Sequence, residues 1–176
     1  MSVRTTATAF APSVAALDFA PLHGVDVVAV ERAAELLAKF GDTVVRRVCT
    51  PSEASWVSLT PRRLAVLLGL KESAIKAIAG RPDGFRWQMV ETSAGELRVP
   101  FPRRAGLPDP VHAVLDGFAA GIGLSEVEAV TVRLAKPALE RADELLPGPG
   151  ELLGAGVFGV RDGHLFAATT FWRDRT

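Results

Sequence analysis

The sequence has only one cysteine, Cys49, among 176 residues. A single thiol excludes an intramolecular disulfide and a zinc site built from several cysteines, and it fits a reducing, cytoplasmic setting. Net charge is lacking as well, since 20 Lys and Arg balance 20 Asp and Glu, which argues against a strongly basic nucleic-acid binder. No long uncharged apolar run precedes Asp18, so we expect neither a signal peptide nor a membrane span.

The length of the chain is enough to bury a core and fits one domain or two small fused halves. We expect residues 1–20 to be a poorly ordered lead-in and residues 21–176 to form a single domain.

Local patterns predict the elements of the first half. A β-branched run over residues 23–30 indicates a buried strand, which Asp26 interrupts. A helix follows over residues 31–40. Thr50-Pro51-Ser52-Glu53 is typical of a capped helix start, and Thr60-Pro61 begins the longest helix, which ends near Ala79.

The second half is richer in strands. We expect hairpins over residues 85–101 and around the Asp162-Gly163 turn, helices over 111–120 and 137–146, and a strand over 127–134. Strands and helices do not alternate one for one, which disfavours a doubly wound parallel sheet. The expected fold class is α+β, with an antiparallel sheet packed against one long helix.

Three charged residues carry the chemical interpretation. Glu72 and Lys76 share one face of the long helix, and Asp26 lies in the first strand. Taken singly, the helix pair reads as an exposed ion pair and Asp26 as a strand-end carboxylate bonded to the backbone. If the strand packs on the helix, the two carboxylates are suitable ligands for Mg²⁺, and the nearby lysines suit phosphates.

The ordered motifs resemble holo-acyl-carrier-protein synthase, of the 4′-phosphopantetheinyl transferase superfamily. That family shows a G-(I/V)-D-(I/V) strand, an R-(V/I)-(F/L)-T-x-x-E segment and a K-E-(A/S)-x-x-K-A helix. The matching stretches here are Gly24–Val27, Arg46–Glu53 and Lys71–Ala77, with weaker matches at Gly84–Val90 and Gly95–Val99. The resemblance covers residues 22–100 well and the rest poorly.

The resemblance implies a role for each site residue. Asp26 and Glu72 would hold Mg²⁺ against the coenzyme A pyrophosphate, and Lys76 would contact the phosphates, with Lys71 as a second contact. Arg32 and Lys39 would dock an acidic acyl carrier protein of fatty acid or polyketide biosynthesis. The resemblance also implies a trimer.

The implied reaction moves phosphopantetheine from coenzyme A to a serine of an acyl or peptidyl carrier protein, with Glu72 as the base for that serine. Cys49 is then expected to be a packed small hydrophobe. Two alternatives remain open: a repurposed member that binds a carrier protein or acts on a carrier-bound acyl intermediate, and a binding or assembly domain without chemistry.

The chain departs from the family pattern at three places. The family's R-F-A-A before K-E is replaced by Val66–Leu70, which has no arginine. The family's C-terminal S-x-(S/T)-H motif is missing, and we expect the nearest histidine, His164, to be an exposed hairpin residue. Residues 135–154 look inserted.

Overall fold

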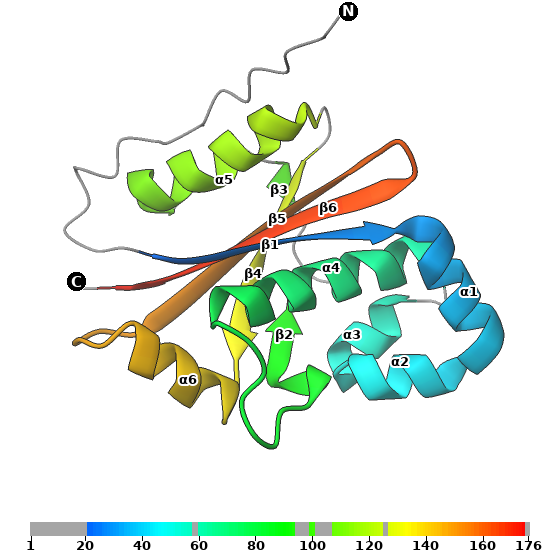
Figure 1. Cartoon of the computed structure of the whole chain (residues 1–176), viewed down its shortest axis with the longest axis horizontal. Coiled ribbons are helices and arrows are strands. Elements are labelled where there is room, and N and C mark those ends of the chain that lie inside the picture. The colour runs from blue at the N-terminus through cyan, green and yellow to red at the C-terminus, as the bar shows by residue number, and fades with distance from the viewer. Residues whose placement is uncertain (1–20, 58–59, 94–98, 101–106, 125–126, 175–176) are drawn as a thin grey trace, which may run out of the picture.

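The computed structural model describes residues 21–57, 60–93, 99–100, 107–124 and 127–174. The expected lead-in over residues 1–20 lies outside the described residues. The described strands form one antiparallel sheet (Figure 1), in which β3 also pairs with β4. Its strands, in sheet order, are β1 (Leu22–Ala29), β6 (His164–Arg173), β5 (Leu152–Arg161), β4 (Glu128–Leu134) and β2 (Val90–Thr92), with β3 at Val99–Pro100. The predicted α+β class with an antiparallel sheet is confirmed.

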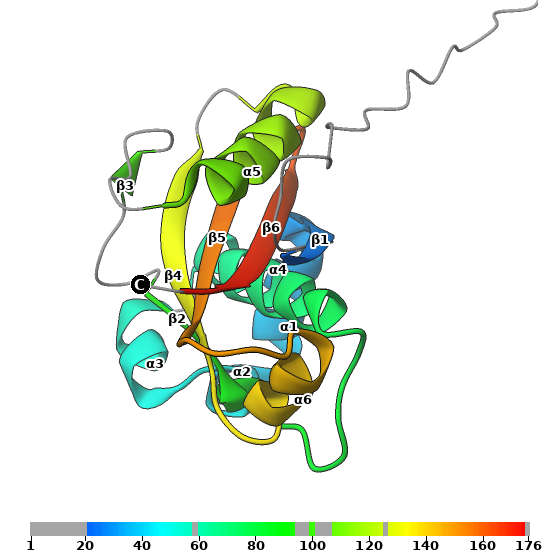
Figure 2. The same ribbon diagram turned by 90° about the vertical axis from the view of Figure 1, so that its left-hand side faces the viewer.

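Helices cover both faces of the sheet (Figure 2). One face carries five of them: α1 (Val30–Phe40), α2 (Asp42–Val48), α3 (Pro51–Val57), α4 (Pro61–Ala77) and α6 (Ala138–Leu145). The other face carries α5 (Asp109–Ile122), which packs on β5 and β6 in a smaller apolar cluster. None of the described helices is both long and apolar enough to cross a bilayer.

Helix α4 is the central element of the larger core. Leu64, Leu67, Leu70 and Ile78 are fully buried, and the helix packs on β1, β6 and α1. Thr60 caps its first turn, where the side-chain oxygen accepts a hydrogen bond from the backbone N–H of Arg63 at 3.4 Å. The predicted long helix is confirmed. Buried residues of α4 are not confined to one face of the helix, because the sheet and other helices surround it.

The predicted start of α3 is also confirmed. The backbone N–H of Thr50 donates to Glu53 Oε2 at 2.8 Å, and the backbone N–H of Glu53 donates to Thr50 Oγ1 at 3.3 Å. These reciprocal bonds are a capping box, which the sequence pattern had indicated.

The β5–β6 hairpin turns where it was predicted. Arg161 pairs with His164 across two residues, Asp162 and Gly163, whose φ angles are 50° and 73°. Positive φ at both central positions is the geometry of the turns that favour Asp-Gly. His164 is exposed, as expected, and its Nδ1 lies 2.9 Å from the carbonyl oxygen of Asp162.

The predicted hairpin over residues 85–101 is wrong. Residues 87–89 form a 3₁₀ turn, and the two short strands that follow, β2 and β3, pair with different stretches of the same strand, β4. Between them, Ser93 still bonds to Thr131 of β4 through its backbone and its hydroxyl. Long-range pairing with β4 therefore prevails over the local turn signal at Ser93-Ala94-Gly95. Residues 94–98 of the predicted hairpin lie outside the described residues.

Candidate active site

Asp26 reaches its position because β1 lies unusually close to α4. A Cβ atom built on Gly24 would lie 2.1 Å from the carbonyl oxygen of Ser73 and 2.5 Å from the backbone nitrogen of Ala77, so only glycine allows this approach. Residues two apart on a strand share one face, so Asp26 faces the same helix as Gly24. Its Oδ1 lies 2.7 Å from Lys76 Nζ, and its side chain is only 14% exposed.

Glu72 lies one helical turn before Lys76 and has a different cationic partner. Its Oε1 lies 2.7 Å from Nη2 of Arg81, in the loop that follows α4. The Arg81 guanidinium carbon also lies 4.8 Å from the ring centroid of Trp87 and 6.0 Å from that of Phe85. Each carboxylate of the predicted pair is therefore matched by its own cation.

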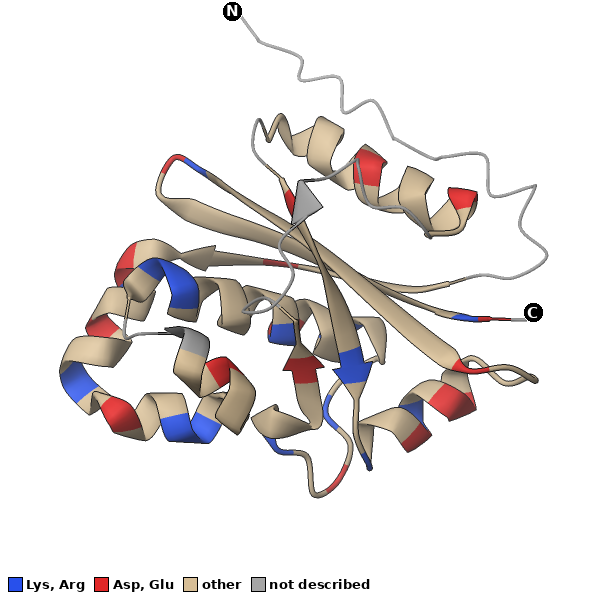
Figure 3. Ribbon diagram, turned by 180° about the vertical axis from the view of Figure 1, so that it is seen from behind, with Lys and Arg blue, Asp and Glu red and all other residues tan. Residues whose placement is uncertain are grey.

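Both carboxylates line one cavity of about 380 Å³ between β1, α1, α2 and α4. Arg32 and Arg47 bring positive charge to the wall, and Figure 3 shows the basic residues of α1 and α2. The remaining lining is mostly apolar: Val27, Val28, Leu36, Phe40, Thr43, Val44, Val48, Leu68 and Trp87. A cavity with an apolar wall and a few convergent charged groups is the usual form of a small-molecule site.

The donor set fits a hard divalent cation. Within the described ranges, no three His, Cys, Asp or Glu side chains cluster so as to hold a metal ion by themselves. Mg²⁺, however, commonly takes one or two carboxylates and completes its shell with water and substrate phosphates. Asp26 and Glu72 supply two such carboxylates on the wall of one cavity.

Lys71 does not fit the expected role of a phosphate contact. Its side chain has no exposed surface, and its Nζ lies 2.7 Å from Glu53 Oε2. The same ammonium donates to the backbone carbonyls of Trp87, at 3.1 Å, and Val90. Lys71 is displaced from Glu72 by about 100° around the helix, so it points into the core and not toward the cavity.

The two residues predicted to dock a carrier protein both lie on α1. Arg32 is exposed and lines the cavity, whereas Lys39 is exposed near the end of the helix, with its Nζ 5.3 Å from the ring centroid of Phe40. A spacing of seven residues puts the two side chains on one face of the helix. Neither has an ion-pair partner in the part of the chain that the structure describes.

Comparison with known proteins shows the family to which the chain belongs. The sequence profile of the 4′-phosphopantetheinyl transferase superfamily matches residues 23–123, which is more than half of the chain. The chain belongs to this superfamily. It is therefore an enzyme of the phosphopantetheinyl transferase class.

Two curated relatives of this superfamily are named holo-acyl-carrier-protein synthase. The one from Solibacter usitatus (strain Ellin6076) is 30% identical over 109 residues, which are 59% of this chain and 81% of the relative. The one from Koribacter versatilis (strain Ellin345) is 30% identical over 113 residues, which are 62% of this chain and 90% of the relative.

Solved structures share the fold at lower identity. Helicobacter pylori holo-acyl-carrier-protein synthase in complex with coenzyme A aligns with a TM-score of 0.53 at 15% identity, over 85% of this chain and 99% of that one. The Chronobacterium ammoniagenes ACPS–CoA complex aligns with a TM-score of 0.54 at 19% identity, over 89% and 99%. These neighbours support the phosphopantetheinyl transferase fold for the chain.

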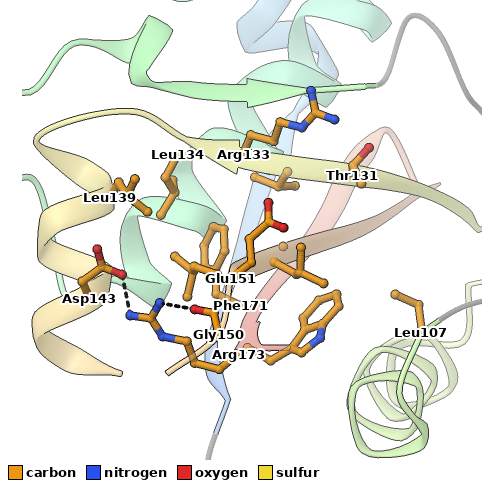
Figure 4. A pocket seen from close by; sticks show the side chains of 15 residues that line it. Leu107, Thr131, Arg133, Leu134, Leu139, Asp143, Gly150, Glu151, Phe171 and Arg173 are labelled. Carbon is orange, nitrogen blue, oxygen red and sulfur yellow. Dashed lines mark hydrogen bonds and ion pairs between the residues drawn. The ribbon is translucent and has the colours of Figure 1, made fainter. Parts of the chain in front are cut away.

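A second cavity, of about 530 Å³, shares no lining residue with the first, and Figure 4 shows the side chains around it. It is lined by β4, β5, β6 and α6, and all of its lining residues except Leu107 lie beyond the stretch that matches the superfamily. At one end Arg173 Nη2 lies 2.5 Å from Asp143 Oδ1 of α6. The stretch 135–154 thus supplies a helix that is tied to the last strand.

Sequence reasoning did not identify Arg81 as part of the candidate active site, nor Glu53 as part of the core beside it. Arg81 follows the end of α4, where Ala79 and Gly80 both have positive φ angles, and its aromatic neighbours Phe85 and Trp87 were the available signal. Glu53 was recognised as a cap, but its bonds to Thr92 and Lys71 join segments that are distant in sequence.

Proposed function

We propose that this enzyme transfers 4′-phosphopantetheine from coenzyme A to a serine of an acyl or peptidyl carrier protein, with Mg²⁺ as its metal. The observation that carries the proposal is the shared cavity of Asp26 and Glu72, which come from separate parts of the stretch that matches the superfamily. The relatives' name, holo-acyl-carrier-protein synthase, supports the same reaction.

The reaction is a displacement at phosphorus. The serine oxygen of the carrier forms a bond to the β-phosphorus of coenzyme A, and the bond from that phosphorus to the bridging oxygen breaks. The 3′,5′-bisphosphoadenosine leaves with the bridging oxygen, and the serine proton passes to the carboxylate of Glu72. No nucleophile on the enzyme is needed.

Charge placement is the main contribution of the enzyme. Asp26 and Glu72 would hold Mg²⁺, which when bound neutralises charge on the pyrophosphate. Lys76, whose side chain is 55% exposed beside Asp26, is available to stabilise the leaving phosphate. Positioning and electrostatics of this kind supply most of the rate in phosphoryl transfer.

The carrier protein is proposed to dock on α1. The exposed Arg32 and Lys39 lie on one face of this helix with Glu35 between them, and the net positive charge that remains there suits an acidic partner. Because Arg32 also lines the cavity, a carrier on this face would present its serine next to Glu72.

Mass spectrometry of apo carrier proteins incubated with coenzyme A and Mg²⁺ tests the proposal. We expect the mass of a cognate carrier to increase by one phosphopantetheine, and we expect chelation or Glu72→Gln to abolish the change. Glu140→Gln is the matched control, since Glu140 is exposed on α6, away from α1, and does not line the cavity. A full rate for Glu72→Gln, or no modification of any carrier by the wild type, would contradict the proposal.

A further inference from the structure

The two carboxylates of the cavity are each neutralised by a cation of the chain itself. Lys76 contacts Asp26 and Arg81 contacts Glu72, both at 2.7 Å. Two negative and two positive charges therefore cancel locally. If Asp26 and Glu72 held a divalent cation, Lys76 and Arg81 would lose their partners, and their charges would favour an anion beside the metal.

Arg81 is placed where its ion pair with Glu72 contributes little. Its side chain is half exposed, at 50%, and it lies in the loop beyond the end of α4. A partly exposed ion pair of this kind is worth little, so a metal ion on Glu72 displaces Arg81 at small cost.

An aromatic surface keeps Arg81 near the cavity after release. Its guanidinium lies over the ring of Trp87, and Trp87 itself lines the cavity. Phe85 packs against Trp87 edge to face, with centroids 6.3 Å apart. The backbone of Trp87 is fixed in turn by the buried Lys71, which donates to its carbonyl oxygen. Because this attraction does not depend on Glu72, the contact with Trp87 is available to Arg81 whether or not the ion pair is formed.

We propose that Arg81 is a further substrate-positioning residue, which holds Glu72 in the free enzyme and moves to the diphosphate of the substrate when a divalent cation takes Glu72. This inference rests on the proposed function. The guanidinium fork suits two phosphate oxygens, a geometry that the ammonium of Lys76 does not offer. Metal and diphosphate then bind cooperatively, each raising the affinity for the other by the same factor.

The inference predicts effects of opposite sign on the two ligands. Arg81→Gln removes the competitor for Glu72, so the affinity for Mn²⁺ alone, measured from the EPR signal of free Mn²⁺, should rise about two- to fivefold. The affinity for coenzyme A in the presence of Mg²⁺, measured by calorimetry, should fall about tenfold or more. Arg81→Lys should recover part of the loss, because it keeps the charge but not the fork.

Arg62→Gln is the matched control, since Arg62 is exposed at the other end of α4 and lines neither cavity. It should change neither affinity, and circular dichroism should show that all variants are folded. If Arg81→Gln weakens Mn²⁺ binding, or leaves both affinities unchanged, the inference is overturned and Arg81 forms a surface ion pair only. If wild-type enzyme binds coenzyme A equally well with and without Mg²⁺, the inference alone fails. If it binds no coenzyme A under any condition, the proposed function fails as well.

Discussion

Lys71 and Glu53 form an ion pair inside the core, with 2.7 Å between Nζ and Oε2 and side-chain exposures of 0% and 1%. Glu53 also accepts bonds from the backbone N–H groups of Thr50 and Thr92 and from the Thr92 hydroxyl. Burial lowers the pKa of Lys71, and the charge of Glu53 opposes that effect. The pair joins α4, the start of α3 and strand β2, just behind the wall of the candidate active site.

Removing one partner of this pair should be strongly destabilising. Lys71→Met leaves the Glu53 carboxylate buried without its cation, and we expect a loss of about 3–5 kcal/mol in the free energy of unfolding. Urea titration measures the loss, and the double variant with Glu53→Gln should lose less than the sum of the single losses. Lys136→Met, at an exposed ion pair, should leave the midpoint nearly unchanged. A small effect of Lys71→Met would show that the core tolerates the unpaired carboxylate.

Gly24→Ala should disturb both stability and the site. The added methyl group meets backbone atoms of α4, so β1 must shift and carry Asp26 away from Lys76. We expect a loss of about 1–3 kcal/mol in the free energy of unfolding and weaker coenzyme A binding in the presence of Mg²⁺. Gly121→Ala is the control, because a Cβ there meets no atom within 4 Å. It should leave binding unchanged and stabilise α5 by about 0.5–1 kcal/mol. If Gly24→Ala and Gly121→Ala changed stability and binding equally, contact between β1 and α4 would not be what requires glycine at position 24.

Cys49 should make stability fall at alkaline pH. Burial, reinforced by the Glu53 charge, raises the pKa of its thiol from 9.0 to about 11. The folded state thus keeps a proton that the unfolded chain releases. The stabilising contribution of the thiol to folding is therefore fully present below pH 9 and is lost as the pH rises through about 11.

Comparison with Cys49→Ala isolates this contribution, because other titrating groups are common to both proteins. Between pH 8 and a pH above 11, we expect the free energy of unfolding of the wild type to fall by about 2–3 kcal/mol more than that of the variant. The native thiol should also resist alkylation at pH 8 until urea unfolds the chain. Rapid alkylation of the native protein would show that the thiol is accessible and its pKa ordinary.

Charge reversal at Arg32 tests the docking face of α1. Arg32→Glu should weaken binding of a cognate carrier protein, most strongly at low salt, and should weaken coenzyme A binding to a smaller extent, because Arg32 also lines the cavity. Surface plasmon resonance at two ionic strengths measures the first effect and calorimetry the second. Arg62→Glu makes the same charge change away from α1 and should alter neither. An equal loss for both ligands with Arg32→Glu would point to damage at the cavity or in the fold.

The sequence by itself determined the elements that depend on neighbouring residues. The Thr50–Glu53 capping box, the Thr60-Pro61 helix start and the Asp162-Gly163 turn all act within a few residues, so their patterns predicted the structure correctly. The order of the motifs around Asp26 and Glu72 also sufficed to indicate the superfamily, which the profile match confirms.

Only the tertiary structure decided which partner each charged residue has. Lys71 and Glu72 are adjacent in the sequence. Lys71 is buried in an ion pair with Glu53, whereas Glu72 lines a cavity and pairs with Arg81. Likewise, β2 and β3 pair with β4 and not with each other, because strand pairing depends on which edge is available. Ion pairs and strand pairs join residues that are distant in the chain, and their geometry is set by how the helices pack on the sheet, which no local pattern contains.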